Sequence, residues 1–171
     1  RELRALLRQP CHLPDISGFH APAQAAQNVR VTIEDSEANP RYAGLLLKNV
    51  QVGPSPEWLQ RRLRSIGLSP INNVVDVTNF VLHELGQPLH AFDADQIQGG
   101  EVRVKRAEAG EKFTTLDGTE RTLQGHDLVI ADATGAPMAL AGVFGGQVSG
   151  VTEATTRVFL ESAYFQPAAV R

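Results

Sequence analysis

The sequence predicts a β-rich α+β fold, a layered β-sandwich with helices packed on one side in a three-layer β/β/α arrangement. The first observation is that about seven segments have strand patterning, whereas only two helices have clear start and stop signals. The second is that strands and helices do not alternate regularly, as they do in parallel βαβ folds. With 171 residues, the chain is long enough to form a sizeable core without disulfides or a metal.

The predicted strands are short apolar or alternating segments bounded by turn residues. They cover residues 28–34, 42–52, 101–106, 127–132, 138–143 and 157–165, with a hairpin over 113–123. The hairpin signal is Asp117-Gly118, a dipeptide that favours tight turns. The continuous run Leu45-Leu46-Leu47 predicts a strand that is buried on both faces.

The first of the two predicted helices starts near residue 55. Ser55 is the expected N-cap, and the following proline and glutamate suit the first turn. Its expected buried face consists of Leu59, Leu63 and Ile66. Residues 1–8 are interpreted more loosely as the end of a helix.

The second predicted helix follows Asn73, its expected N-cap, with Asp76 at the position of a capping-box acid. Gly86 and Pro88 predict a firm C-terminal stop, so that the turn beyond it presents His90. The expected apolar face has helical spacing and comprises Val74, Val77, Val81 and Leu85.

Composition limits the function classes. The 16 Lys and Arg residues against 19 Asp and Glu residues give a net charge of −3, which argues against a broad nucleic-acid coat but permits local contact with a nucleic-acid end. The single cysteine, Cys11, excludes a disulfide framework. The sequence has no membrane-spanning apolar run and no signal-peptide pattern, so a cytoplasmic location is expected.

The predicted domain organisation has two parts. Residues 1–28 are expected to be a connector from a preceding region, because they are weakly patterned and rich in Pro, Ala and Gln. Residues 29–171 are expected to form one domain. The chain begins at Arg1 rather than Met, which suggests a piece of a longer protein.

Glu161 stands out by pattern within the last predicted strand. Alternation places it on the same face as Phe159 and Ala163, so that face is apolar except for one carboxylate. A buried carboxylate must be hydrogen-bonded or paired, or its pKa rises. From the residues alone, a structural glutamate and a ligand-binding glutamate are equally compatible with this pattern.

The histidines give no metal-site signal. His90 is isolated between Leu89 and Ala91, and a lone histidine in such a setting is more often structural than catalytic. The others show no metal-ligand spacing with one another or with Cys11, namely His12, His20, His83 and His126. No metal is therefore expected.

A glycine-rich segment at residues 142–150 follows the predicted strand 138–143. It is neither a P-loop nor a dinucleotide-binding fingerprint. Its glycines either let a ligand approach exposed backbone amides or form a tight turn between strands. The pattern does not decide between these two interpretations.

Five ordered motifs resemble the bacterial phenylalanyl-tRNA synthetase beta subunit. They are VVDVTNFVLHELGQPLHAFD at residues 74–93, LDGT at 116–119, LVIAD at 128–132, ALAGVFGG at 139–146 and FLESAYF at 159–165. The resemblance extends from about residue 29 to the end of the chain. Their order and number make it specific for the central editing module of that subunit.

The resemblance implies a function in editing, which is the hydrolysis of tyrosyl-tRNA(Phe) formed by mischarging. The family's pocket residues correspond to Thr78, Asn79, His90, Gly142, Gly145 and Glu161. Glu161 would recognise the tyrosine hydroxyl in an otherwise apolar slot. His90 would position or deprotonate the attacking water, or bind the terminal adenosine, and the sequence leaves these roles open. Backbone amides near Gly142 and Gly145 would hold the amino acid or the oxyanion.

The same resemblance implies the partners. They are the alpha subunit in an α2β2 heterotetramer, the acceptor end of tRNA(Phe) and tyrosine, with no membrane. No cofactor is expected in this chain, whereas ATP and magnesium are implied for the full synthetase. The family pocket also uses a segment beyond Arg171, so the pocket of this chain alone is expected to be incomplete. The alternative is a non-catalytic structural or tRNA-docking module.

Overall fold

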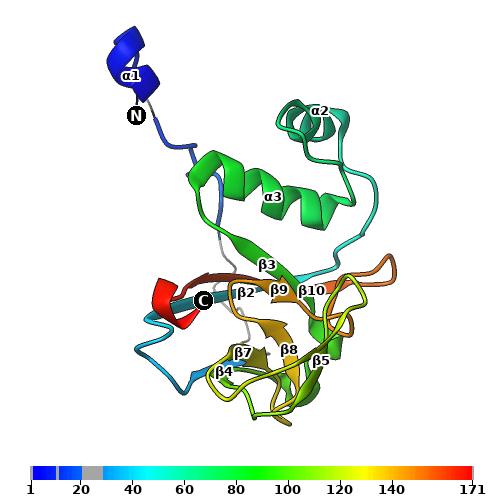
Figure 1. Cartoon of the computed structure of the whole chain (residues 1–171). Helices are drawn as coiled ribbons and strands as arrows, with labels where there is room; N and C mark the ends of the chain where they lie inside the picture. The colour runs from blue at the N-terminus through cyan, green and yellow to red at the C-terminus, as the bar shows by residue number, and fades with distance from the viewer. Residues whose placement is uncertain (1, 11, 21–28, 171) are drawn as a thin grey trace.

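The computed structural model describes residues 2–10, 12–20 and 29–170 and has the β-rich α+β fold that the sequence predicts (Figure 1). Its α-helices are α1 (Glu2–Leu7), α2 (Glu57–Ser65) and α3 (Asn73–Leu85). The first seven strands are β1 (Arg30–Ile33), β2 (Arg41–Lys48), β3 (Leu89–Asp93), β4 (Glu101–Arg106), β5 (Lys112–Thr114), β6 (Glu120–Thr122) and β7 (Leu128–Ala131). The last three are β8 (Pro137–Leu140), β9 (Phe144–Gly145) and β10 (Arg157–Tyr164). Short 3₁₀ helices span Ala94–Gln96, Gln98–Gly100 and Pro167–Ala169.

The strands form a five-stranded, a three-stranded and a two-stranded sheet. The five-stranded sheet has the order β1-β4-β7-β8-β9, and β1 pairs in parallel with β4, whereas the other pairs are antiparallel. The three-stranded sheet, β2-β10-β3, is antiparallel. Helices α2 and α3 lie on one side of the three-stranded sheet, and the strands β4, β7 and β8 lie on the other (Figure 1).

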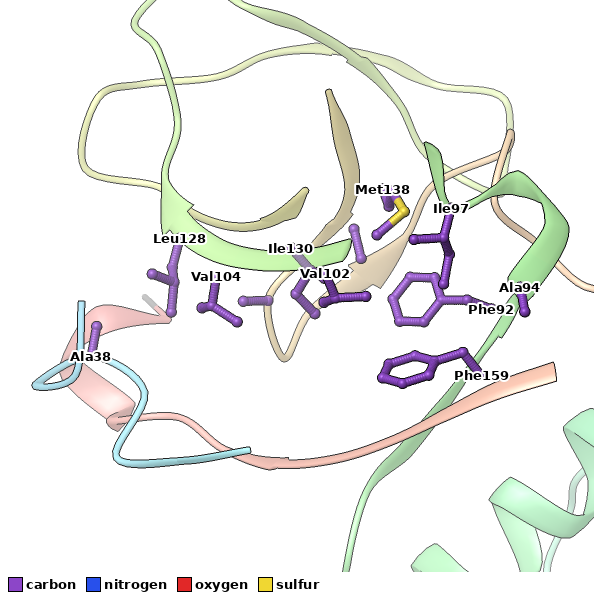
Figure 2. Packing of buried hydrophobic residues seen from close by; sticks show 12 residues of the cluster. Ala38, Phe92, Ala94, Ile97, Val102, Val104, Leu128, Ile130, Met138 and Phe159 are labelled. Atoms are coloured by element: carbon purple, nitrogen blue, oxygen red, sulfur yellow. The ribbon is translucent and has the colours of Figure 1, made fainter. Parts of the chain in front are cut away.

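The main core fills the space between the two larger sheets. Phe92 of β3 and Phe159 of β10 project from one sheet, and Val102, Val104 and Ile130 project from the other (Figure 2). Burying each such side chain contributes about 1.5–3 kcal/mol to stability. This core fixes the separation of the sheets, and the cavity described below opens between them.

The prediction that β2 is buried on both faces is wrong. Leu46 packs against the core, but Leu45 and Leu47 point to the other face and are 42% and 37% exposed. The reason is that β2 lies at the edge of the three-stranded sheet, where the described helices leave its outer face partly uncovered. Residues 89–93 form strand β3, whereas their sequence pattern predicts a turn.

The start of α3 differs from the prediction by one residue. Asn72, not Asn73, is the N-cap, because its side-chain oxygen accepts hydrogen bonds from the amides of Val74 and Val75. Gly86 has the left-handed conformation expected of a helix stop, with φ of 76°. The chain therefore leaves the helix directly toward Pro88 and β3.

The predicted buried faces of the two helices need correction. In α3 the buried side chains are polar, Asp76 and Thr78, whereas Val77 and Leu85 are exposed. The apolar spacing was misleading because Asp76 binds the loop before the helix and turns that face inward.

In α2, Leu59 and Leu63 are buried as predicted, but Ile66 is exposed because the helix ends at Ser65 and leaves Ile66 at its C-cap. Ser55 does not cap this helix, since its hydroxyl donates to Asp76 instead.

The N-terminal segment is described only in part. Helix α1 agrees with the helical interpretation of residues 1–8. Cys11 and residues 21–28 of the predicted connector lie outside the described residues. The predicted boundary between connector and domain at residue 28 stays a prediction.

Candidate ligand cavity

A cavity of ≈ 490 Å³ lies beside the core, between the three-stranded sheet and the turn that joins β8 to β9. Four of the six predicted site residues line it: His90, Gly142, Gly145 and Glu161. Most of the remaining lining is apolar, including Ile130, Leu140, Phe144, Ala163 and Phe165. The cavity therefore combines an apolar wall with two titratable side chains from the predicted set.

Strand register brings the two titratable side chains together. Glu161 on the central strand β10 pairs with His90 on β3 and with Gly44 on β2. Residues that pair directly across antiparallel strands project from the same face of the sheet. His90 and Glu161 are therefore neighbours on the face that looks into the cavity, although they are far apart in the sequence.

Glu161 is a buried carboxyl group with only one of its oxygens hydrogen-bonded. It is 5% exposed, and the Tyr42 hydroxyl donates to Oε2 at 3.0 Å. Among the described residues, none donates to Oε1. Burial raises the pKa of Glu161 to about 7, against the opposing effect of the Tyr42 hydrogen bond. One acceptor oxygen is thus left for a ligand at the cavity wall.

Tyr42 was not predicted as a site residue. Its burial and the neighbouring Glu161 carboxylate raise the pKa of the Tyr42 hydroxyl far above its usual value, so it stays a hydrogen-bond donor. No local signal in the sequence marks Tyr42. Its role depends on the pairing of β2 with β10, which joins residues 119 positions apart.

His90 is a neutral imidazole at physiological pH. Burial lowers its pKa to about 4, and its ring packs edge-on against Phe92 with 4.4 Å between ring centroids. Within the described part of the chain, neither ring nitrogen makes a hydrogen bond. The ring is held by packing, and its nitrogens are available to a water molecule or a ligand.

Gly145 makes room for this imidazole. A Cβ atom at position 145 would lie 2.6 Å from Cε1 of His90 and 2.9 Å from a Leu116 methyl group. Such distances are shorter than van der Waals contact, so a larger residue would displace the ring. The glycine is required here by the close approach of β9 to β3.

Gly142 lies in a tight turn, which is one of the two interpretations left open for the glycine-rich segment. Its φ of +70° is in the left-handed region, and a Cβ atom would lie 3.1 Å from the Phe165 ring. The Val143 amide donates to the Leu140 carbonyl at 3.0 Å and closes the turn. The turn nevertheless forms part of the cavity wall, so a backbone contact with a ligand stays compatible with this geometry.

Thr78 and Asn79 are not among the residues that line this cavity. They lie on α3, and the hydroxyl of Thr78 donates to the Val75 carbonyl at 2.7 Å within the helix. Their predicted contribution to the pocket stays a prediction.

No cluster of three or more His, Cys, Asp or Glu side chains suited to a metal ion occurs within residues 2–10, 12–20 and 29–170. None of the helices in these same ranges combines the length and apolar character needed to cross a bilayer.

Comparison with known proteins defines the class. The model of the B3/4 domain family matches residues 38–171, and the chain belongs to this family. A curated relative from Bacteroides fragilis, the phenylalanine–tRNA ligase beta subunit, is 61% identical over 175 residues, which cover 100% of this chain and 21% of the relative. The same subunit from Halalkalibacterium halodurans is 52% identical over 170 residues, covering 99% of this chain and 21% of the relative.

A solved structure agrees with the fold. The crystal structure of an N-terminal fragment of the phenylalanyl-tRNA synthetase beta subunit from Pyrococcus horikoshii has a TM-score of 0.59. It is 19% identical, with coverage of 84% of this chain and 45% of that chain. The predicted resemblance to the beta subunit is confirmed by the curated relatives. The chain spans about a fifth of the length of the curated relatives it matches.

Proposed function

We propose that this chain is the editing module of a phenylalanine–tRNA ligase beta subunit and hydrolyses tyrosyl-tRNA(Phe). The observation that carries the proposal is the Glu161 carboxyl group, which is buried at an apolar cavity wall with Oε1 unpaired. Tyrosine and phenylalanine differ only in a phenolic hydroxyl, so a pocket that separates them needs one polar group at the far end of an apolar slot. Glu161 supplies that group.

The selectivity follows from hydrogen bonding. A tyrosyl hydroxyl would donate to Oε1, whereas a phenylalanyl ring would bury this oxygen without a donor. Sites built to hydrogen-bond a substrate hydroxyl can reject the analogue that lacks it by roughly 10⁴–10⁵. The apolar lining, including Phe144 and Ala163, would hold the rest of the ring.

His90 is suited to act on the attacking water. Its lowered pKa keeps the imidazole neutral at pH 7, and a neutral imidazole accepts a hydrogen bond from water and can orient or deprotonate it. A contact with the terminal adenosine of the tRNA is the other role compatible with its free nitrogens. Backbone amides near Gly142 and Gly145 are proposed to hold the ester oxygen, although the Val143 amide is already used within the turn.

The wider assembly is part of the same proposal. The partners would be the alpha subunit and the acceptor end of tRNA(Phe), in the cytoplasm. ATP and magnesium would serve aminoacylation by the full synthetase, and no step proposed for this chain uses them.

The test is deacylation of preformed tyrosyl-tRNA(Phe) by the full synthetase in the absence of ATP. Glu161→Ala is expected to reduce the preference for the tyrosyl over the phenylalanyl ester, and His90→Ala is expected to reduce the hydrolysis rate. A rate that is unchanged in both variants would exclude the proposed assignment.

A non-catalytic structural or tRNA-docking module is the second candidate. The observation that favours it is the position of Thr78 and Asn79 on α3, outside the cavity lining. Titrating the chain with free tyrosine and phenylalanine separates the two. A tyrosine preference that disappears in Glu161→Gln supports the editing pocket, whereas binding of neither amino acid supports docking or a pocket that needs residues from elsewhere in the subunit.

A further inference from the structure

Tyr42 is the only described residue whose side chain hydrogen-bonds to the Glu161 carboxyl group. We propose that Tyr42 is a specificity-determining positioning residue: its hydroxyl occupies Oε2 of Glu161 and thereby leaves Oε1 as the acceptor for the hydroxyl of a bound tyrosyl group. This inference rests on the proposed editing function and assigns a role to a residue outside the predicted site.

The sheet geometry explains why Tyr42 makes this contact. Directly opposite Glu161 on β2 is Gly44, which has no side chain, and Tyr42 pairs with Ala163 two residues further along β10. Such diagonal neighbours are within reach of aromatic side chains. The space over Gly44 is taken by the ring of Phe159, since a Cβ atom at position 44 would collide with that ring. The neighbours of Glu161 on this face of the sheet therefore include Phe159 and Tyr42.

The contact with Tyr42 uses one oxygen of the Glu161 carboxyl group and leaves the other without a protein donor. An ionised carboxylate has two oxygens that only accept hydrogen bonds. Because Tyr42 occupies Oε2, the oxygen without a protein donor is Oε1, and Glu161 lines the cavity. A bound tyrosyl hydroxyl would donate to Oε1, so that both carboxylate oxygens are hydrogen-bonded. A bound phenylalanyl ring would cover Oε1 without donating to it, which is costly.

Tyr42 also favours the ionised form of Glu161. Its hydrogen bond lowers the pKa of Glu161 against the larger, opposite effect of burial. The other titratable side chains at the cavity wall are His90 on β3 and Tyr164 on β10, and among the described residues no Lys or Arg lines the cavity. His90 is neutral near pH 7 because burial lowers its pKa to about 4. Tyr42 therefore increases the ionised fraction of Glu161 near neutral pH.

The experiment is a double-mutant cycle in the full synthetase without ATP. Tyr42→Phe, Glu161→Gln and the double variant are compared by kcat/KM for deacylation of tyrosyl-tRNA(Phe) and of phenylalanyl-tRNA(Phe). Tyr42→Phe keeps the ring and removes only the hydroxyl. It is expected to reduce the tyrosyl-over-phenylalanyl ratio by about 10- to 100-fold, the effect of losing one hydrogen bond to a charged group.

Two readouts separate this role from a merely structural one. In the Glu161→Gln background, Tyr42→Phe is expected to cause no further loss, because both residues act through the same carboxylate. The pH at which the tyrosyl preference is half lost on acidification is expected to be higher in Tyr42→Phe than in the unaltered enzyme. Ser162→Ala, which removes a hydroxyl next to Glu161 from the opposite face of β10, is the matched control and should change neither readout.

The outcomes are distinguishable. If Glu161→Gln leaves the preference unchanged, the proposed editing function fails and this inference fails with it. If Glu161→Gln abolishes the preference but Tyr42→Phe retains it, the editing function stands and the role of Tyr42 is overturned. An equal loss from Tyr42→Phe in both backgrounds would also overturn it, because Tyr42 would then act independently of Glu161.

Discussion

Two buried carboxylates, Asp76 and Glu161, differ in how completely their oxygens are satisfied. Asp76 is fully buried at the start of α3, where Oδ1 accepts from the Ile71 amide at 2.8 Å and Oδ2 accepts from the Ser55 hydroxyl at 2.5 Å. Glu161 is almost as buried but has a donor on one oxygen only. Burial of a carboxyl group is therefore not by itself a functional signal. The informative feature is a carboxyl oxygen that has no donor among the described residues and belongs to a side chain lining a cavity, where a ligand can reach it.

The largest effect on stability is expected from Asp76, the carboxylate with donors on both oxygens. Asp76→Ala removes the acceptor for both donors, the Ser55 hydroxyl and the Ile71 amide, which tie the start of α3 to the preceding loops. Leaving the buried Ser55 hydroxyl and the part-buried Ile71 amide unpaired is expected to lower the free energy of unfolding by about 2–4 kcal/mol. Urea unfolding followed by circular dichroism measures this change.

The matched control is Glu161→Gln. It is expected to leave the free energy of unfolding unchanged or to raise it, since the amide oxygen still accepts from Tyr42 and the buried charge is removed. A loss of stability equal to that of Asp76→Ala would show that both carboxylates are structural.

The next effect is the pH dependence of stability. The pKa of Glu161 is about 7 in the folded protein against an ordinary value of 4.5, so its contribution is complete below about pH 4.5 and is lost as the pH rises through 7. His90 acts oppositely: its folded pKa of about 4 against 6.5 gives a contribution that is complete above pH 6.5 and is lost as the pH falls through 4. Between pH 4.5 and 6.5 the two trends nearly cancel.

Replacing either residue alone makes the pH dependence that the other contributes to stability measurable. Between pH 4.5 and 6.5, Glu161→Gln is expected to show a free energy of unfolding that rises by about 2–3 kcal/mol, because the His90 contribution is left alone. His90→Gln is expected to show a fall of similar size over the same range. Urea titrations at the two pH values measure both, and parallel pH profiles for the two variants would contradict the assigned shifts.

The smallest expected effect concerns the glycine that accommodates His90. Gly145→Ala forces a methyl group against the imidazole and is expected to lower the free energy of unfolding by about 1–3 kcal/mol. Deacylation of tyrosyl-tRNA(Phe) by the full synthetase is expected to fall more than this stability loss explains, because the ring is displaced. Gly53→Ala, where a Cβ atom meets nothing within 4 Å, is the control. Equal deacylation rates in the two variants would argue against a role for the ring position.

Local patterns in the sequence predicted much of this architecture. The alternation at residues 157–165 correctly placed Glu161 on the same face as Phe159, because the side-chain period of a strand is visible within a few residues. The stop at Gly86 was likewise predicted from its neighbours. By contrast, the N-cap was misplaced because Asn72 and Asn73 are chemically identical and only the backbone geometry separates them.

The candidate site was predicted less completely, for a physical reason. Strand β3 was missed because its five residues follow a proline turn, and the contact between Tyr42 and Glu161 depends on pairing between distant strands. The exposure of Leu45 likewise depends on which side of the sheet is covered, and that is decided by the packing of other elements. Strand register and layer order are tertiary properties that no short window of sequence contains.

The strand order of the three-stranded sheet has a consequence for how the protein folds. The central strand, β10, comes last in the chain, and β2 and β3 pair with it but not with each other. Neither outer strand can therefore join this sheet before residues 157–164 are in place. Contacts over such long sequence separations form slowly, since the loop-closure entropy must be lost first. We expect Tyr42, His90 and Glu161 to come together in a single late, cooperative step. A folding intermediate in which β10 is not yet paired would lack both the Tyr42–Glu161 hydrogen bond and the pairing of His90 with Glu161.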